Sequence, residues 1–190
     1  DHFDNIIYHK PNRYVNPYSV PYHQVPEECI RYKWAIDRSN KDWVFFTHND
    51  VLYTGDIIGN MFKEVEKWKL NNPNNRVVGC AQMHQCWNCP AIEICGGGEK
   101  WELWNPSFED IKKLKLPHVR TRLNNLHPTV PKLMPECRVN EWAALIDRNA
   151  CIEEKSCNFG DFTEDSTVAW FRAMHLKGYK FIDYRKDFHH

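Results

Sequence analysis

The clearest pattern of hydrophobic and polar positions lies between residues 43 and 69. Residues 43–46 form a short apolar run of strand-forming side chains, which predicts a buried strand. From Ile57 to about Lys69 apolar residues recur at helical spacing, which predicts an amphipathic helix that Asp56 caps. The polar residues between the two elements are therefore expected at the carboxyl end of a buried strand.

Weaker patterns predict further elements along the chain. The apolar run at 139–147 fits either a strand or a helix, and we favour the strand. The other predicted elements are strands at 5–8, 76–80 and 179–184 and short helices at 28–37, 108–114 and 168–176. Because strands and helices alternate, the sequence predicts an α/β fold with a mostly parallel sheet flanked by helices.

Composition and charge narrow the class of protein. The length of 190 residues fits one domain over residues 1–190, with a cysteine-rich insertion at about 80–138. The 25 basic and 25 acidic residues cancel, so charge gives no reason to expect nucleic acid or an anionic membrane as a partner. No apolar stretch of the sequence is long enough to span a bilayer, and the lack of a glycosylation sequon favours a cytoplasmic location. The sequence also lacks a glycine-rich phosphate loop and a Gly-x-Ser-x-Gly elbow, which disfavours kinases and esterases.

The tripeptide His48-Asn49-Asp50 follows the predicted strand directly. In an extended segment residues two apart point the same way, so His48 and Asp50 can reach one metal ion together. A carboxylate suits magnesium or manganese, and the imidazole shifts the preference towards manganese or a softer ion. Open α/β sheets bind ligands at the carboxyl ends of their strands. The tripeptide is also typical of a plain polar turn in which Asp50 caps nearby amides.

Glu164 and Asp165 precede the predicted helix at 168–176. A carboxylate at a helix N-terminus is stabilised by free amides and by the helix dipole. It stays ionised at neutral pH, as a general base must be before it takes a proton from a hydroxyl. The same position is also typical of simple helix capping.

The cysteine-rich region contains a candidate zinc site. Cys86 and Cys89 have the spacing of zinc ligands, and Cys80, His84 and Cys95 are further donors nearby. A single pair accompanied by isolated residues fits disulfides or ordinary buried cysteines equally well. The sequence therefore leaves structural zinc, disulfide pairing and burial as alternatives.

Taken in order, these segments resemble the GT-A fold glycosyltransferases of the family 2 type. Residues 33–51, from Lys-Trp-Ala-Ile to Asn-Asp-Val, are similar to the family's helix, strand and acidic metal motif, with His48 where the first aspartate usually stands. Residues 163–180, from Thr-Glu-Asp through a Trp- and Arg-bearing helix to Gly-Tyr-Lys, resemble its Glu-Asp element. His189-His190 after the closing strand is similar to the histidine that ends the catalytic region of many members.

The resemblance covers roughly residues 28–80 and 139–190 and implies a GT-A-like sheet. The family begins with a βαβ unit that binds the nucleobase, and such a unit takes about 30 or more residues. No counterpart of that unit stands before Asp1, so we expect an N-terminally truncated domain in which residues 5–8 form an internal strand.

The resemblance also implies an activity and roles for the site residues. The chain would be an inverting glycosyltransferase that moves a sugar from a nucleotide-sugar donor, a UDP-sugar as first candidate, to a hydroxyl of a glycan, lipid or protein acceptor. Asp165, with Glu164 beside it, would be the base that deprotonates this hydroxyl. The expected donor-binding residues are His48, Asn49 and Asp50, and the expected ligands of Mn²⁺ or Mg²⁺ are Asp50, His48 and His189, with His190 as the alternative histidine.

Three other interpretations stay open. The fold could be kept as a non-catalytic sugar- or partner-binding module, because His48 departs from the metal motif. The second is a zinc-stabilised interaction domain built on Cys80–Cys95, which includes the Cys86 and Cys89 pair. His189-His190 is also typical of a purification-tag remnant.

Overall fold

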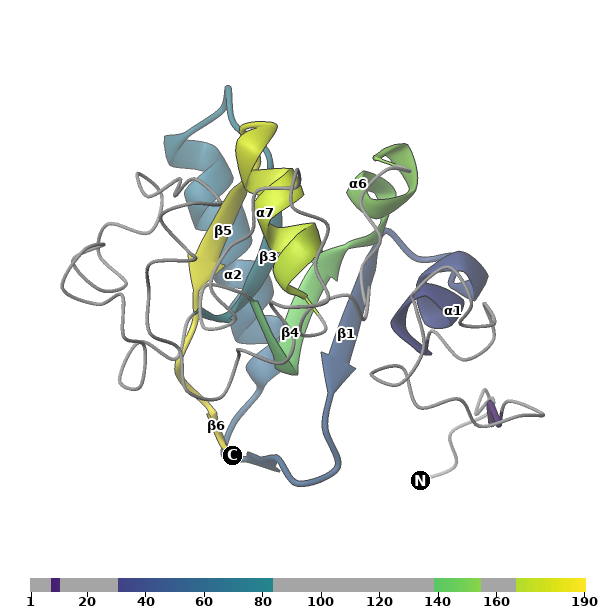
Figure 1. The fold of residues 1–190 in the computed structure, drawn as a ribbon. Helices are drawn as coiled ribbons and strands as arrows, with labels where there is room; N and C mark the ends of the chain where they lie inside the picture. The colour runs from purple at the N-terminus through teal and green to yellow at the C-terminus, as the bar shows by residue number, and fades with distance from the viewer. Residues whose placement is uncertain (1–7, 11–30, 84–138, 155–166) are drawn as a thin grey trace, which may run out of the picture.

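The main sheet of the described residues has four strands, with helices packed around it (Figure 1). The computed structural model describes residues 8–10, 31–83, 139–154 and 167–190. Across the sheet the strands are β1 (Trp43–Thr47), β4 (Val139–Asp147), β3 (Val77–Met83) and β5 (Lys180–Asp183). A second sheet consists of the two short strands β2 (Leu52–Tyr53) and β6 (Phe188–His189), which pair antiparallel.

Helices cover both faces of the main sheet. Figure 1 shows α7 (Val168–Leu176) in front of the sheet and α2 (Ile57–Asn71) behind it. Two shorter helices, α1 (Arg31–Arg38) and α6 (Arg148–Glu153), lie beside β1. The sheet is therefore the middle layer of the described part of the chain.

The buried side chains of β3 are divided between two hydrophobic clusters, with a shift of register near Gly79. Val78 and Ala81 pack in the cluster that contains Trp170 of α7, while Val77 and Cys80 pack with α2 in the other cluster. Successive side chains of a strand point to opposite faces, so a strand covered on both sides needs apolar residues throughout. This requirement explains why the central strands β3 and β4 consist mostly of apolar residues.

Several predicted elements are confirmed. The predicted strand at 43–46 is β1, and the ambiguous run at 139–147 is the strand β4. The predicted helix from Ile57 is α2, and the Asp56 side chain caps it by accepting a hydrogen bond of 3.0 Å from the amide of Gly59. The predictions at 28–37, 76–80, 168–176 and 179–184 correspond to α1, β3, α7 and β5. The helix at 108–114 and most of the strand at 5–8 lie outside the described residues.

The α/β content is confirmed, but the expectation of a mostly parallel sheet is wrong for the described strands. Among the described strands only β3 and β5 pair parallel, because β4 lies between β1 and β3 and runs antiparallel to both. An apolar run indicates that a strand is buried, but it does not indicate whether the strand runs parallel or antiparallel to its neighbours. The sheet is therefore mixed, with β1, β3 and β5 running the same way.

Candidate functional site

The carboxyl end of β1 positions His48. The last β1 residue, Thr47, pairs with Ala143 of β4, and the amide of His48 continues the ladder by donating to the carbonyl of Trp142 at 3.1 Å. The backbone of His48 is therefore fixed by the sheet, although its side chain stands beyond the last strand residue. Asp50 follows two residues later, as the sequence pattern predicts.

The β2–β6 pair brings the end of the described chain to the same place. Leu52 pairs with His189 and Tyr53 with Phe188, so the residue after β6 lies beside the residues just before β2. The Nε2 atom of His190 lies 3.5 Å from Oδ1 of Asp50. The His190 ring also packs on Trp142, with 4.0 Å between ring centroids.

His48, Asp50 and His190 form the candidate metal centre. One ligand atom from each residue lies within 4.8 Å of the other two. Two ligands on one ion with bonds of about 2.1 Å are at most about 4.2 Å apart, so small side-chain movements close the site. The side chains are 38%, 67% and 30% exposed, so an ion can reach all three from solvent.

The donor set fits a transition metal better than a hard ion. Magnesium and calcium prefer oxygen ligands, whereas imidazole suits zinc, copper, iron and nickel. Two imidazoles and one carboxylate leave coordination positions free for a ligand's own oxygen atoms. The arrangement can therefore hold an ion that also binds a phosphate or carboxylate group.

Glu141 and Tyr32 face the ring of His48. Nε2 of His48 lies 4.0 Å from Oε1 of Glu141 and 3.5 Å from the hydroxyl of Tyr32. Glu141 belongs to β4 and is only 8% exposed, which is unusual for a carboxylate. A carboxylate next to a metal-binding imidazole commonly fixes the orientation of the ring. Sequence analysis missed Glu141, although a charged residue inside an apolar run is a visible signal.

No protein-family model matches the sequence. Comparisons with characterised proteins and with solved structures also found no match. The site is therefore interpreted from its own geometry. In the part of the chain that the structure describes, no helix combines the length and apolar character needed to cross a membrane.

The predicted metal and donor-binding residues are only partly brought together. His48 and Asp50 meet as predicted, and Asn49 lies exposed between them. The predicted ligand His189 is not in the group; it is exposed on β6, and His190 takes its place. Consecutive residues of a strand point to opposite sides, so only one histidine of the pair can face Asp50.

The predicted catalytic carboxylates, Glu164 and Asp165, lie outside the described residues. The helix that follows them, α7, begins after Thr167, whose side chain makes no capping bond to the helix. Its hydroxyl donates instead to the carbonyl of Val139 on β4. This buried bond fixes the start of α7 against the sheet.

The predicted zinc site also lies largely outside the described residues, which exclude His84, Cys86, Cys89 and Cys95. Cys80 is described and is fully buried in β3. Burial, with a smaller effect of the Glu64 charge, raises the pKa of the Cys80 thiol to about 12. Zinc binds the thiolate, so the structure gives Cys80 no support as a ligand.

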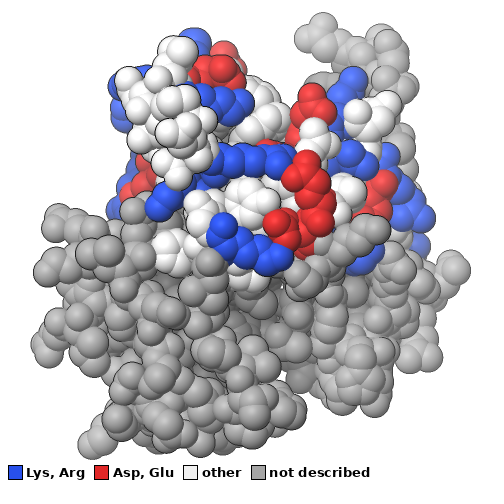
Figure 2. All heavy atoms as spheres, turned by 90° about the horizontal axis from the view of Figure 1, so that it is seen from above, with Lys and Arg blue, Asp and Glu red and all other residues white. Residues whose placement is uncertain are grey.

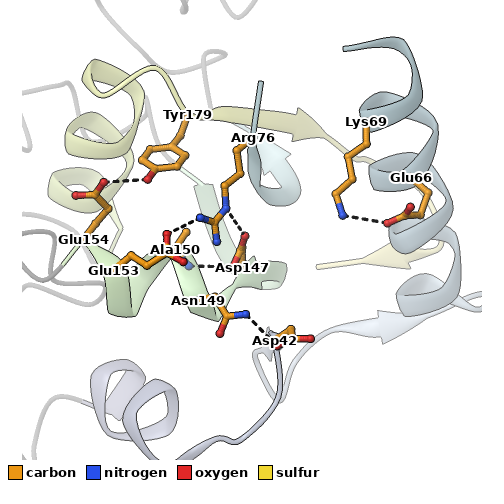
Figure 3. Close-up of polar contacts among 10 residues, drawn as sticks. All are labelled: Asp42, Glu66, Lys69, Arg76, Asp147, Asn149, Ala150, Glu153, Glu154 and Tyr179. Atoms are coloured by element: carbon orange, nitrogen blue, oxygen red, sulfur yellow. Dashed lines mark hydrogen bonds and ion pairs between the residues drawn. The ribbon is translucent and has the colours of Figure 1, made fainter. Parts of the chain in front are cut away.

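The opposite edge of the sheet, at the amino end of β1, carries charged side chains that pair with one another. Figure 3 shows Arg76 between the carboxylates of Asp147 and Glu153, with 3.0 Å from Nε to Asp147 Oδ2. Burial lowers the pKa of Arg76, but the bonds to Glu153 and Asp147 outweigh it and raise the pKa above its usual value. Seen from above, acidic and basic side chains lie next to one another on this face (Figure 2).

A second group on this edge is centred on Glu154. Its carboxylate accepts a hydrogen bond of 2.9 Å from the hydroxyl of Tyr179 and pairs with the ammonium of Lys177. These two bonds, that of Lys177 first, lower the pKa of Glu154. Charges here satisfy one another, which is the arrangement expected of a structural network.

Proposed function

We propose that this chain is part of an inverting glycosyltransferase that takes a sugar from a nucleotide-sugar donor, with a UDP-sugar as first candidate. The observation that carries the proposal is the meeting of His48, Asp50 and His190 beyond the carboxyl end of β1. These residues come from two segments that are distant in sequence. The resemblance implies metal binding for His48 and Asp50, with His190 as the alternative to His189. We further propose that the mixed sheet belongs to a truncated GT-A-like domain, with the cytoplasm as its location.

The side chains of His48, Asp50 and His190 would hold Mn²⁺ or Mg²⁺. The two imidazoles favour Mn²⁺ over Mg²⁺. When bound, such an ion supplies stabilisation of the negative charge that develops on a leaving diphosphate. Glu141 and Tyr32 would hold the His48 ring in its orientation from the side of β4 and α1. The exposure of Asp50 leaves room for the diphosphate on the solvent side of the group.

The transfer itself would be a single displacement. The acceptor hydroxyl oxygen forms a bond to the anomeric carbon while the bond from that carbon to the diphosphate oxygen breaks. The hydroxyl proton passes to the carboxylate of Asp165, with Glu164 as its neighbour, and the diphosphate leaves with the electron pair. One displacement inverts the anomeric centre. The assignment of this base rests on the resemblance alone.

The test is a turnover assay with the full-length protein. A panel of UDP-sugars and other nucleotide sugars is incubated with Mn²⁺ and acceptor mixtures, and release of the nucleotide diphosphate is measured. Manganese-dependent release that is lost in Asp50→Ala supports the proposal. A matched control is Asp37→Ala, because Asp37 is a surface carboxylate that, within the described residues, pairs with Lys33 one helical turn away.

Three other outcomes have defined meanings. Manganese-dependent nucleotide binding without turnover would favour the non-catalytic binding module over the enzyme. Failure to bind any nucleotide diphosphate, with or without metal, would contradict the proposal. About one tightly held zinc per chain that is lost in Cys86→Ser would favour the zinc-stabilised domain.

A further inference from the structure

The β2–β6 pair alone is a weak anchor for His190. It contains two residues from each strand. Isolated two-stranded hairpins are marginal in water even when they are longer than this. A residue placed by so short a pair needs another restraint if its side chain is to stay within reach of His48 and Asp50.

Asp187 makes contacts that can supply this further restraint on His190. Its φ of 65° makes it the one non-glycine residue with positive φ in the described part of the chain. Its Oδ2 accepts a hydrogen bond of 2.9 Å from Nδ2 of Asn60 in α2, and the hydroxyl of Tyr184 donates to the same oxygen. Its backbone carbonyl accepts from the amide of Thr54 at 2.9 Å.

Gly55 packs directly against this carboxylate. A β-carbon at position 55 would lie 2.8 Å from Oδ1 of Asp187, closer than such contacts normally allow. Asp187 therefore ties together α2, the segment after β2 and the turn before β6. The next residue, Phe188, is buried in the hydrophobic cluster that contains Met61.

We infer that Asp187 is a positioning residue for the metal ligand His190. Its carboxylate holds the turn at 184–187 against α2 and the 54–55 segment. That turn sets the direction of Phe188 and His189, and so the place where His190 meets Asp50. The inference rests on the proposed metal site, in which Asp187 itself is not one of the three ligands.

The role of the carboxylate can be separated from the role of the backbone. Asp187→Gly keeps the left-handed conformation without strain but removes the carboxylate, whereas Asp187→Asn keeps an oxygen acceptor in a residue that tolerates positive φ. We expect Asp187→Gly to raise the Kd for Mn²⁺ about 10- to 100-fold, in the range seen when residues that orient metal ligands are changed. Asp187→Asn should stay within about threefold of the unmodified protein, because both the acceptor and the conformation remain.

A matched pair of tyrosines controls for simple loss of stability. Tyr184→Phe removes the hydroxyl that donates to Asp187, while Tyr179→Phe removes the hydroxyl that donates to Glu154 at the opposite edge of the sheet. Each variant loses one hydrogen bond to a carboxylate. Only Tyr184→Phe should weaken Mn²⁺ binding, whatever the two variants do to the melting temperature.

A double-mutant cycle tests whether Asp187 acts through His190. In the His190→Ala background, Asp187→Gly should cause no further change in the Kd for Mn²⁺. The position of the ring is measured separately and without metal, from the NMR shifts of the His190 imidazole, which lies 4.0 Å from the Trp142 ring. In Asp187→Gly these shifts should move towards the values of an unpacked histidine.

The outcomes separate this inference from the proposed function. If the unmodified protein binds Mn²⁺ through His190 and Asp187→Gly changes neither the Kd nor the His190 shifts, the inference is wrong and the proposed function stands. If the unmodified protein binds no metal, the proposed function fails. In that case unchanged His190 shifts in Asp187→Gly would still overturn the positioning role, and shifted ones would support it.

Discussion

The two edges of the main sheet carry similar residue types in opposite arrangements. At the amino end of β1, the guanidinium of Arg76 sits between two carboxylates, and Glu154 is bonded by Tyr179 and Lys177. At the carboxyl end, donor atoms of His48, Asp50 and His190 converge on one point that is open to solvent. Mutual satisfaction indicates a structural role, whereas exposed ligand atoms that converge on one point can bind an ion. The comparison predicts that changes at the first edge alter stability and changes at the second alter binding.

The largest expected effect is on metal binding in Asp50→Ala. The variant removes the only carboxylate of the three ligands, so the Kd for Mn²⁺ should rise by at least about 100-fold, the upper end of the effect of residues that merely orient ligands. Calorimetric titration with Mn²⁺ measures the change. Asp50 is exposed, so thermal unfolding should shift little in the same variant. A large loss of stability with an unchanged Kd for Mn²⁺ would show that Asp50 has a structural role instead of a binding role.

Glu141→Gln should have the next largest effect. The substitution keeps the size of the side chain but removes the charge that faces His48 across 4.0 Å. We expect the Kd for Mn²⁺ to rise about 10-fold, because a carboxylate beside a ligating imidazole orients it and increases its basicity. The same titration measures this change. An unchanged Kd for Mn²⁺ would show that Glu141 does not contribute to the site.

Arg76→Ala tests the other edge. The change leaves Asp147, which is 7% exposed and caps α6 through the amide of Ala150, without its cation. Since the Arg76 side chain is 38% exposed and partly screened, we expect a loss of only about 1–2 kcal/mol in the free energy of unfolding. Urea denaturation measures the loss, and Lys69→Ala, which removes a surface pair with Glu66, is the control. Weaker Mn²⁺ binding in Arg76→Ala would show that the two edges are not independent.

The smallest expected effect concerns acid stability. The pKa of Glu154 is lowered in the folded state, chiefly by Lys177 and then by Tyr179. Its contribution is therefore present above the pKa of the unfolded chain and is lost as the pH falls through the folded pKa. Glu154→Gln should be slightly less stable than the unmodified protein at pH 7, and the difference should shrink below about pH 4. A difference that grows on acidification would contradict this assignment.

The sequence predicts the parts of the fold that depend on burial. The apolar runs of β1, β3 and β4 and the helical spacing of α2 follow from the need to cover a central sheet on both faces. The direction of β4 does not follow, because an antiparallel strand between two covered faces has the same composition as a parallel one. Strands β2 and β6 contain two residues each, too few to show any alternation.

Two of the three ligands of the candidate site were predictable from the sequence. His48 and Asp50 are visible because two polar residues at spacing two follow a buried strand. The choice between His189 and His190 depends on the register of β6, which follows a turn that Asp187 makes with positive φ. Asp is among the residues that tolerate this conformation, but its presence alone does not predict positive φ at position 187. Glu141 faces the site only because β4 pairs with β1, a contact between segments nearly a hundred residues apart.

The most direct test of the metal site compares the two neighbouring histidines. Calorimetric titration with Mn²⁺ is carried out on the unmodified protein, His190→Ala and His189→Ala. The structure predicts that the unmodified protein and His189→Ala bind one ion with similar Kd, while His190→Ala binds at least about 10-fold more weakly. Equal binding in all three proteins, or loss in His189→Ala alone, would contradict the assignment of His48, Asp50 and His190 as the metal centre.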